Sequence, residues 1–184
     1  MIAQVQQRII VILVLFLLVP DQVQPRVFNE LAAPTLKDDA TIVIASGYNV
    51  FYKLLNFKPT QNVVMVAPRL VISRGIARSI LSALLVHRMI GSSVRTLYTK
   101  GKGFPCFVSV EQDGSGDALA IALALSRAIG ATKAGAISSS AREETAMDLF
   151  AEQALWPNII MLFRLTSTVF RCTSPQLTSF KGGV

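Results

Sequence analysis

The chain has 184 residues, of which 52% are hydrophobic and 16% are charged, a balance typical of a globular protein that buries a core. This composition excludes a disordered or fibrous chain and predicts one domain, or one domain and part of another. The formal net charge of +7 would suit an anionic partner, but the basic residues are dispersed and not interleaved with stacking aromatic residues, which argues against nucleic acid.

The first predicted element is the apolar run Ile9–Val19, which follows Arg8. A charged residue before an apolar run imitates a signal peptide, and a small secreted or membrane-anchored protein is the alternative that this run supports. However, the run is too short to span a bilayer. It also leads into Pro20 without a small-residue cleavage site and is rich in β-branched residues. We therefore predict a buried parallel strand.

Short apolar runs then alternate with helical patterns, which indicates βαβ units around a parallel sheet. A helix is expected over Gln22–Ala33, with Val23, Val27 and Leu31 on one face and Pro34 at its end. The other expected elements are strands at Thr41–Ala45, Asn62–Ala67, Phe104–Val110 and Ala134–Ile137, a short helical turn at Tyr52–Leu55, and a helix at Asp117–Ile129.

A last helix is predicted from Ala141 to about Phe163, bent near Pro157. It is preceded by Ser140, and the sequence Ser-Ala-Arg-Glu has the form of a capping box, in which the Ser140 hydroxyl and the Glu143 carboxylate accept from backbone donors at the helix start. Residues 166–184 are polar and lack periodicity, so we expect an irregular, poorly ordered tail.

Five short segments carry a more specific signal than the periodicity. They are Leu18-Val19-Pro20-Asp21-Gln22, Ser46-Gly47-Tyr48-Asn49-Val50, Val64-Met65-Val66-Ala67-Pro68-Arg69, Gly103-Phe104-Pro105 and Asp148-Leu149-Phe150-Ala151-Glu152-Gln153. Together with Lys133-Ala134-Gly135 and Ser-Ser-Ala-Arg-Glu-Glu at 139–144, they resemble, in order, landmarks of the ketol-acid reductoisomerase (acetohydroxyacid isomeroreductase) family. The resemblance runs from about Ile9 to Arg164 and skips Leu70–Arg88.

The resemblance implies an α/β fold: a partial Rossmann-like parallel sheet with helices, followed by the first long helix of an α-helical, knotted-type domain. We expect the Rossmann NADP-binding-type domain over residues 1–139 and the start of the helical domain over 140–184, with an irregular tail from about 165. Leu70–Arg88 is an atypical insert, since a short loop is usual there. Its removal restores the family's loop, and we interpret it as a translated intron.

The family's glycine-rich phosphate loop belongs to a βα unit that precedes the matched segment, so we expect it to be absent. The sequence Gly114-Ser115-Gly116 has Leu119 where a third glycine would fall, and it is interpreted as a structural loop. The family's cofactors are NADPH and Mg²⁺.

By resemblance, Asp21, Gln22 and Val23 occupy the loop that touches the cofactor, and Gly91 matches a glycine that approaches it closely. An ordinary strand-to-helix turn is the alternative interpretation of each position. We assign no catalytic residue.

Asp148 and Glu152 are the predicted metal ligands, because a separation of four residues puts both carboxylates on one helical face within reach of shared magnesium. The family's equivalent pair binds two magnesium ions that polarise the substrate oxygens. From spacing alone, a solvated helix face is the alternative. Glu143 and Glu144 are interpreted as helix-start residues favoured by the helix dipole.

The sequence departs from the family pattern at two positions. Ser46 stands where the family commonly has histidine, and a hydroxyl cannot replace a group that titrates near neutrality. Arg69 stands where lysine usually follows Ala-Pro, which keeps the charge but changes the donor geometry. The single histidine of the chain, His87, lies inside the insert and receives no role.

The resemblance implies an oxidoreductase that isomerises and reduces an acetohydroxy acid, with NADPH and magnesium, in valine, isoleucine and leucine biosynthesis. Without the phosphate loop and the later metal ligands, we expect this fragment to be inactive alone. The alternative is a noncatalytic Rossmann-like binding or regulatory module. The apolar face of the helix 141–163 predicts a homo-oligomer in either case. We expect no nucleic-acid or membrane partner. The two cysteines lack metal-ligand or disulfide spacing, so an intracellular location is expected, either cytoplasmic or organellar.

Overall fold

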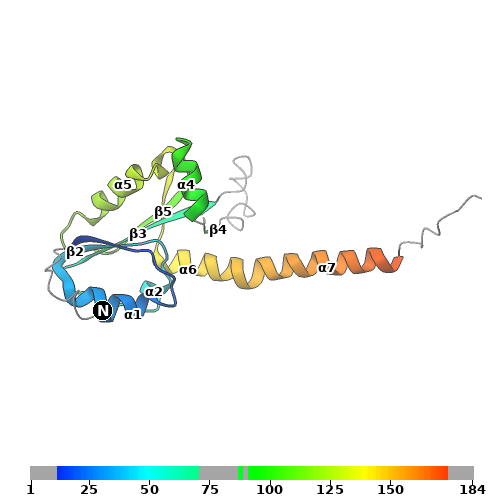
Figure 1. Ribbon diagram of the computed structural model, residues 1–184, viewed down its shortest axis with the longest axis horizontal. Helices are drawn as coiled ribbons and strands as arrows, with labels where there is room; N and C mark the ends of the chain where they lie inside the picture. Colours follow the sequence, from blue (N-terminus) through cyan, green and yellow to red (C-terminus); the bar gives the residue numbers. More distant parts are fainter. Residues whose placement is uncertain (1–11, 71–86, 89–90, 174–184) are drawn as a thin grey trace, which may run out of the picture. The chain divides into compact units, whose positions relative to one another are not determined.

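The computed structural model describes residues 12–70, 87–88 and 91–173. The chain divides into two compact units, Met1–Asp148 and Leu149–Val184. The first unit is a sheet with helices on both faces, and the second is helical (Figure 1). The predicted domain boundary between 139 and 140 stays a prediction.

The described strands of the first unit form one sheet. They are β1 (Ile12–Leu17), β2 (Leu36–Ile44), β3 (Asn62–Leu70), β4 (His87–Arg88), β5 (Cys106–Gln112) and β6 (Ala136–Ser138). Neighbouring strands follow the order β1-β2-β3-β5-β6, and β4 pairs with β3. The β1–β2, β2–β3 and β5–β6 pairs are parallel, which confirms the α/β, Rossmann-like fold class.

The β3–β5 pair is antiparallel, which differs from the predicted all-parallel sheet. Pro68, near the end of β3, is in register with Cys106 at the start of β5. The chain therefore leaves β3 and enters β5 at the same end of the strands. A parallel neighbour would instead need a crossover that carries the chain back to the opposite end. Such a crossover does join β5 to β6, through α5 (Ala118–Ala128).

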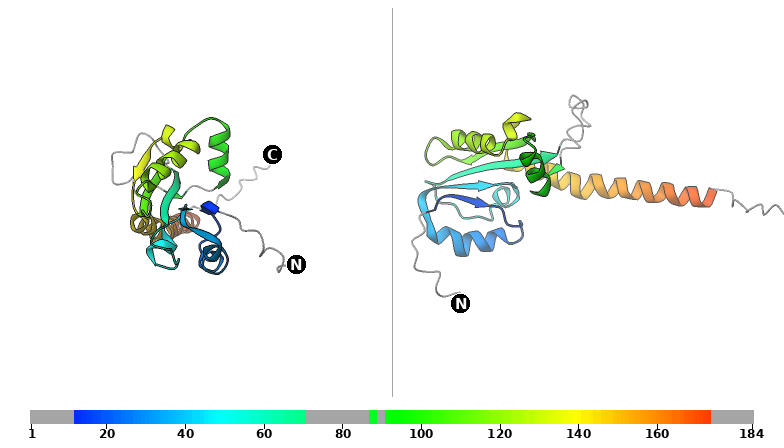
Figure 2. Two further views of the ribbon diagram at one scale, coloured as in Figure 1. Left: turned by 90° about the vertical axis from the view of Figure 1, so that its left-hand side faces the viewer. Right: turned by 45° about the horizontal axis from the view of Figure 1, so that its top comes forward.

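Helices cover both faces of this sheet. The helices of the first unit are α1 (Gln24–Arg26), which continues into η1 (Val27–Ala32) and η2 (Ala33–Thr35), α2 (Tyr48–Phe51), α4 (Gly91–Thr99), α5, η3 (Ala131–Lys133) and α6 (Ala141–Leu149). Figures 1 and 2 show α1 and α2 on one face, and α4 and α5 on the opposite face. The expected short turn at 52–55 lies instead at Tyr48–Phe51.

Two apolar cores follow from the alternation of side chains along the central strands. The core on the α1 side contains Leu17, Phe28, Leu36, Ala40, Ile42, Ile44, Leu55, Met65, Ala67 and Phe107. The core on the α5 side contains Val43, Val64, Val66, Phe104, Cys106, Val108, Ala118, Ala122 and Ala131. Because both faces are covered, β2 and β3 contain continuous apolar runs rather than alternating polar and apolar residues.

The strand predicted at Ile9–Val19 is confirmed over Ile12–Leu17, and residues 9–11 lie outside the described part. It is less buried than predicted: Leu17 belongs to a core, but Leu13 and Phe16 are exposed. The reason is that β1 is an edge strand of the described sheet. Over the residues that the structure describes, no helix combines the length and apolar character needed to cross a membrane.

The helix after β1 buries a different face from the one predicted. Val23 and Leu31 are 44% and 65% exposed, whereas Gln24 and Phe28 are buried. The Phe28 ring packs edge-on against Phe57, with 5.1 Å between ring centroids. Residues 27–32 are π-helical, so the 3.6-residue period on which the prediction depended does not hold there.

The second unit consists of η4 (Phe150–Leu155) and α7 (Trp156–Thr173). The prediction of an irregular tail is wrong as far as Thr173, and later residues lie outside the described part. Hydroxyl groups bond back along the helix: Thr166 Oγ1 donates to the Leu162 carbonyl at 2.8 Å. This lets Ser and Thr continue a helix despite their modest propensity.

The Phe28 side chain offers a direct test of the core on the α1 side. Replacing Phe28 with Ala removes a fully buried ring and leaves a cavity, so we expect the free energy of unfolding to fall by about 3–5 kcal/mol. Leu31→Ala, three residues further along, removes an exposed side chain and should change it by less than about 0.5 kcal/mol. Urea unfolding followed by circular dichroism measures both. Equal effects of the two substitutions would show that the buried face has been misassigned.

Candidate functional site

A cavity of about 410 Å³ lies at the carboxyl ends of β1 and β2. Its walls are mostly apolar and come from Leu17, Leu18, Val19, Pro20, Ala45, Pro68 and Val94, with Gly91 at the start of α4. Its polar groups are Asp21, Gln24 and Ser46. Open α/β sheets bind ligands at the carboxyl ends of their strands, so this cavity is the candidate binding site.

The polar wall of the cavity is held by side-chain hydrogen bonds. The Ser46 hydroxyl donates to Asp21 Oδ2 at 3.1 Å. Gln24 Nε2 donates to the Val19 carbonyl at 2.8 Å, and Asn49 Nδ2 donates to Gln24 Oε1 at 2.9 Å. The turn after β1 and the loop after β2 are therefore fixed to each other.

The structure separates the predicted cofactor residues into two groups. Asp21 and Gly91 both line the cavity, although they are far apart in the sequence. Gln22 and Val23 lie in the adjoining exposed turn and do not line it. Gln24, which the sequence analysis did not select, does line it. Only its position next to the Asp21 motif could have suggested this, and the cofactor role of all these residues stays a prediction.

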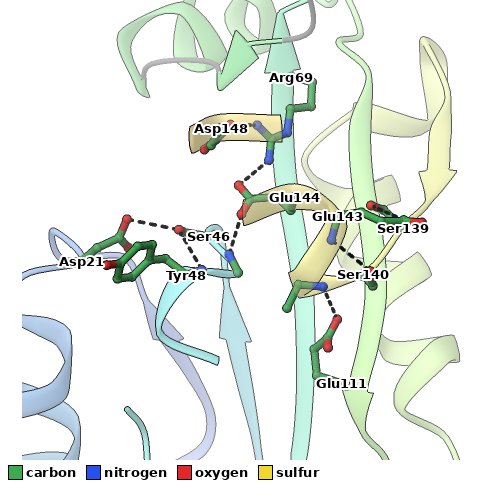
Figure 3. Close-up of polar contacts among 12 residues, drawn as sticks. Asp21, Ser46, Tyr48, Arg69, Glu111, Ser139, Ser140, Glu143, Glu144 and Asp148 are labelled. Carbon is green, nitrogen blue, oxygen red and sulfur yellow. Dashed lines mark hydrogen bonds and ion pairs between the residues drawn. The ribbon is translucent and has the colours of Figure 1, made fainter. Parts of the chain in front are cut away.

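A buried ion-pair cluster lies beside this region (Figure 3). The Arg69 side chain is fully buried at the end of β3, and its guanidinium bonds the carboxylates of Glu144 and Asp148 on α6. The Nη1–Oδ1 distance to Asp148 is 2.5 Å. The guanidinium also lies over the Phe107 ring, 4.7 Å from its centroid. A charge-assisted contact of this kind joins the strand to the helix.

The loop after β2 packs directly on the start of α6. Gly47 N–H donates to Glu144 Oε2 at 2.7 Å. A Cβ atom at Gly47 would lie 2.5 Å from the Ala141 carbonyl oxygen, so only glycine permits this approach. Since Ser46 lines the cavity and Gly47 contacts Glu144, the cavity wall and the ion-pair cluster share one loop.

The helix start confirms part of the predicted capping box. The Ser140 hydroxyl accepts from Glu143 N–H at 3.2 Å. Glu143 Oε2 accepts from the Ser139 hydroxyl at 3.1 Å. The Ala141 N–H donates instead to Glu111 Oε1, on β5, at 2.7 Å. A strand residue thus contributes to the cap.

Glu144 is not the simple helix-start residue that the sequence analysis described. It is completely buried and bonds both Arg69 and Gly47. The misinterpretation arose because charged residues near a helix start are usually solvated. Its spacing of four residues from Asp148, on the face that also buries Ala141 and Thr145, was the signal that could have revealed it.

Comparison with known proteins decides the ancestry. The family model described as "Acetohydroxy acid isomeroreductase, NADPH-binding domain" matches residues 2–74 and 70–135. The chain belongs to this family. The two matched segments overlap at residues 70–74, and the second runs through the predicted insert at 70–88, so the insert stays a prediction. Residues 71–86 lie outside the described part.

Curated relatives carry the name ketol-acid reductoisomerase (NADP(+)). The protein from Methanobrevibacter smithii is 39% identical over 142 residues, which is 77% of this chain and 37% of the relative. The protein from Pyrobaculum aerophilum is 41% identical over 142 residues, 76% of this chain and 37% of the relative. The chain therefore spans little more than a third of the length of these reductoisomerases.

A solved reductoisomerase structure agrees with this membership. An NADH-preferring ketol-acid reductoisomerase from an uncultured archaeon has a TM-score of 0.70 and 30% identity, covering 88% of this chain and 44% of that one. A semialdehyde dehydrogenase NAD-binding protein from Cupriavidus necator has a TM-score of 0.64 at 14% identity, covering 89% and 55%. The second likeness concerns the fold alone.

The magnesium implied by the reductoisomerase family does not fit the arrangement around Asp148. Mg²⁺ requires near-octahedral oxygen coordination. Asp148 Oδ1 and both oxygens of Glu144 instead accept from protein donors. Within the described ranges, no group of three or more His, Cys, Asp or Glu side chains could hold a metal. Glu152 is exposed and belongs to the second unit, so its pairing with Asp148 stays a prediction.

The loop at Gly114-Ser115-Gly116 has the structural role that was predicted. Asn62 Oδ1 accepts from Gly114 N–H at 2.8 Å and from Ser115 N–H at 3.0 Å. Asp113 Oδ1 accepts from Gly116 N–H at 2.7 Å. Because protein oxygens take these donors, the loop does not offer them to a phosphate.

Cys106 is not a candidate nucleophile. It is buried in the core on the α5 side, and this burial raises the pKa of its thiol. A raised pKa keeps the thiol protonated near neutral pH, and the thiolate is the reactive form.

Substitutions of two adjacent glutamates, Glu143 and Glu144, test the ion-pair cluster. Glu144→Gln leaves the buried Arg69 with one carboxylate instead of two, and we expect it to lower the free energy of unfolding by about 3 kcal/mol. Glu143→Gln, at an exposed position, should lower it by less than about 0.5 kcal/mol. Denaturant unfolding at neutral pH measures the difference. Similar losses from the two variants would contradict the assigned burial of Glu144.

Proposed function

We propose that this chain is the part of a ketol-acid reductoisomerase that binds the nicotinamide end of NADP(H), in the cavity at the carboxyl ends of β1 and β2. The observation that carries the proposal is that the cavity brings together Asp21 and Gly91, which the resemblance had independently assigned to the cofactor. A cavity of about 410 Å³ suits one ring and its substituents rather than a whole dinucleotide.

The lining of the cavity is chemically suited to a nicotinamide. Leu17, Pro68 and Val94 supply apolar surface against which a flat ring can pack. Asp21 and Ser46 place oxygen atoms where a carboxamide could bond them. A Cβ atom at Gly91 would meet nothing within 4 Å, so the backbone leaves open space at this wall.

The proposed reaction of the whole protein is the isomerisation and NADPH-dependent reduction of an acetohydroxy acid. The cofactor, when bound, would supply a hydride. The residues of this chain would orient the nicotinamide ring and exclude water from one side of it through the apolar wall. We propose that the chain alone does not complete this reaction, since the arrangement around Arg69 does not offer Asp148 to magnesium.

Gly91→Leu should test the cavity without disturbing the fold. The new side chain would enter open space at the cavity wall, so we expect the affinity for NADPH to fall by at least about tenfold while the melting temperature stays unchanged. The matched control is Ser92→Leu, which adds the same side chain at the next, exposed position outside the cavity lining. Nucleotide fluorescence titration measures the affinity. No saturable fluorescence change with the unmodified chain would refute the proposed function.

A second candidate function, a noncatalytic module that associates with its own copies, is supported by the surface of α7. Within the second unit, Leu162, Phe163 and Val169 are 64%, 72% and 58% exposed. Apolar side chains exposed at this density commonly mark an interaction surface.

Phe163→Glu should therefore reduce self-association. A charge in an apolar interface opposes its burial, so we expect the apparent mass at high protein concentration to decrease toward that of a monomer. Arg164→Glu, at the adjacent exposed position, is the control for the added negative charge. Sedimentation velocity over a range of concentrations measures both variants. A wild-type chain that stays monomeric throughout would refute the self-association proposal and leave the cofactor proposal unaffected.

A further inference from the structure

The contacts of Arg69 indicate that a positively charged side chain of the protein itself acts as the cation of this cluster. Its guanidinium donates to Glu144 Oε1 from one terminal nitrogen and to Asp148 Oδ1 from the other. We propose that Arg69 serves as an internal cation in place of Mg²⁺, so that Asp148 is not a magnesium ligand in this chain and β3 is joined to α6 without a metal. This inference goes beyond the proposed nicotinamide site and does not depend on it.

The first argument concerns the coordination positions. A metal ion bound by Asp148 would compete with the guanidinium for Oδ1, which Arg69 already bonds, and the guanidinium also bonds Oε1 of the neighbouring Glu144. The remaining oxygen of Glu144 accepts the Gly47 N–H at 2.7 Å. Glu144 therefore has a protein donor on each of its two oxygens.

The second argument concerns solvent. Mg²⁺ loses its water reluctantly and usually keeps several water molecules when it binds a protein. The side chains of Arg69, Glu144 and Asp148 are 0%, 1% and 10% exposed. A hydrated ion would need space that the guanidinium and its surroundings already fill.

The third argument concerns the position of the guanidinium itself. It lies 4.7 Å from the centroid of the Phe107 ring, and the Arg69 backbone N–H donates to the Pro105 carbonyl at 2.8 Å. Divalent cations would have to displace a charge that is anchored by its strand, its ring contact and two carboxylates.

Binding of Mn²⁺, a spectroscopic substitute for Mg²⁺, tests the proposal on the full chain. The loss of the free Mn²⁺ signal in electron paramagnetic resonance reports binding directly and needs neither NADPH nor activity. We expect the wild-type chain to show no Mn²⁺ binding that depends on Asp148. Arg69→Gln removes the internal charge, and we expect it to bind Mn²⁺ at least about tenfold more tightly than the wild type.

Two further variants locate the effect and guard against unfolding. Arg69→Gln combined with Asp148→Asn should lose the gained affinity. Arg69→Lys keeps the charge on a flexible stem and is the substitute if Arg69→Gln does not fold. Lysine cannot bridge two carboxylates with a planar fork, so a smaller gain in Mn²⁺ affinity is expected. Asp148→Asn in the wild-type background should lower the melting temperature equally with and without Mg²⁺.

The outcomes separate the alternatives. Wild-type binding of Mn²⁺ that Asp148→Asn abolishes would overturn the proposal, because it would show Asp148 acting as a metal ligand with Arg69 present. A folded Arg69→Gln or Arg69→Lys chain that binds Mn²⁺ no better than wild type would also overturn it. Binding that appears only when Arg69 is replaced, and disappears with Asp148→Asn, supports it.

Discussion

The buried positive charge of Arg69 requires carboxylate partners, and this requirement governs how the first unit is arranged around them. Arg69 lies near the end of the central strand β3 and its side chain is fully buried, where an unpaired guanidinium would be strongly unfavourable. The charge therefore requires acidic partners, and α6 provides them at the two positions, Glu144 and Asp148, that lie on its buried face. The place of α6 against the sheet follows from this electrostatic requirement, since α6 contributes few apolar side chains to either core.

A single loop connects the buried ion-pair cluster to the candidate binding site. Ser46 and Gly47 are adjacent, and one lines the cavity while the other donates to Glu144. Gly47 can do so only because it lacks a Cβ atom that would collide with Ala141. The same loop reaches Asp21, because the Ser46 hydroxyl donates to Asp21 Oδ2. The candidate binding site and the buried charge are thus connected through adjacent residues of one loop.

Apolar runs and short motifs are formed by residues that are neighbours in the sequence. These local patterns were sufficient to predict the family, the helix α5 and the strands β1, β2, β3 and β5. The antiparallel pairing of β5 with β3 could not be predicted in this way, because it depends on which end of the strands the chain re-enters. The π-helical turn at 27–32 shifted the buried face to Phe28. Glu144 was missed because burial of a carboxylate depends on a partner 75 residues away.

Ancestry and site chemistry depend on different residues in this chain. The motif containing Asp148 resembles the reductoisomerase family, whose model matches residues 2–135, but in this structure Asp148 bonds the guanidinium of Arg69. The resemblance expects lysine where Arg69 stands, and a lysine ammonium is a compact point charge on a flexible stem that can move aside for a metal. A guanidinium spans two carboxylates at fixed geometry and stays where its strand holds it. In our proposal, the arginine at this position of β3 therefore joins Asp148 to the strand and takes the place of a metal ion.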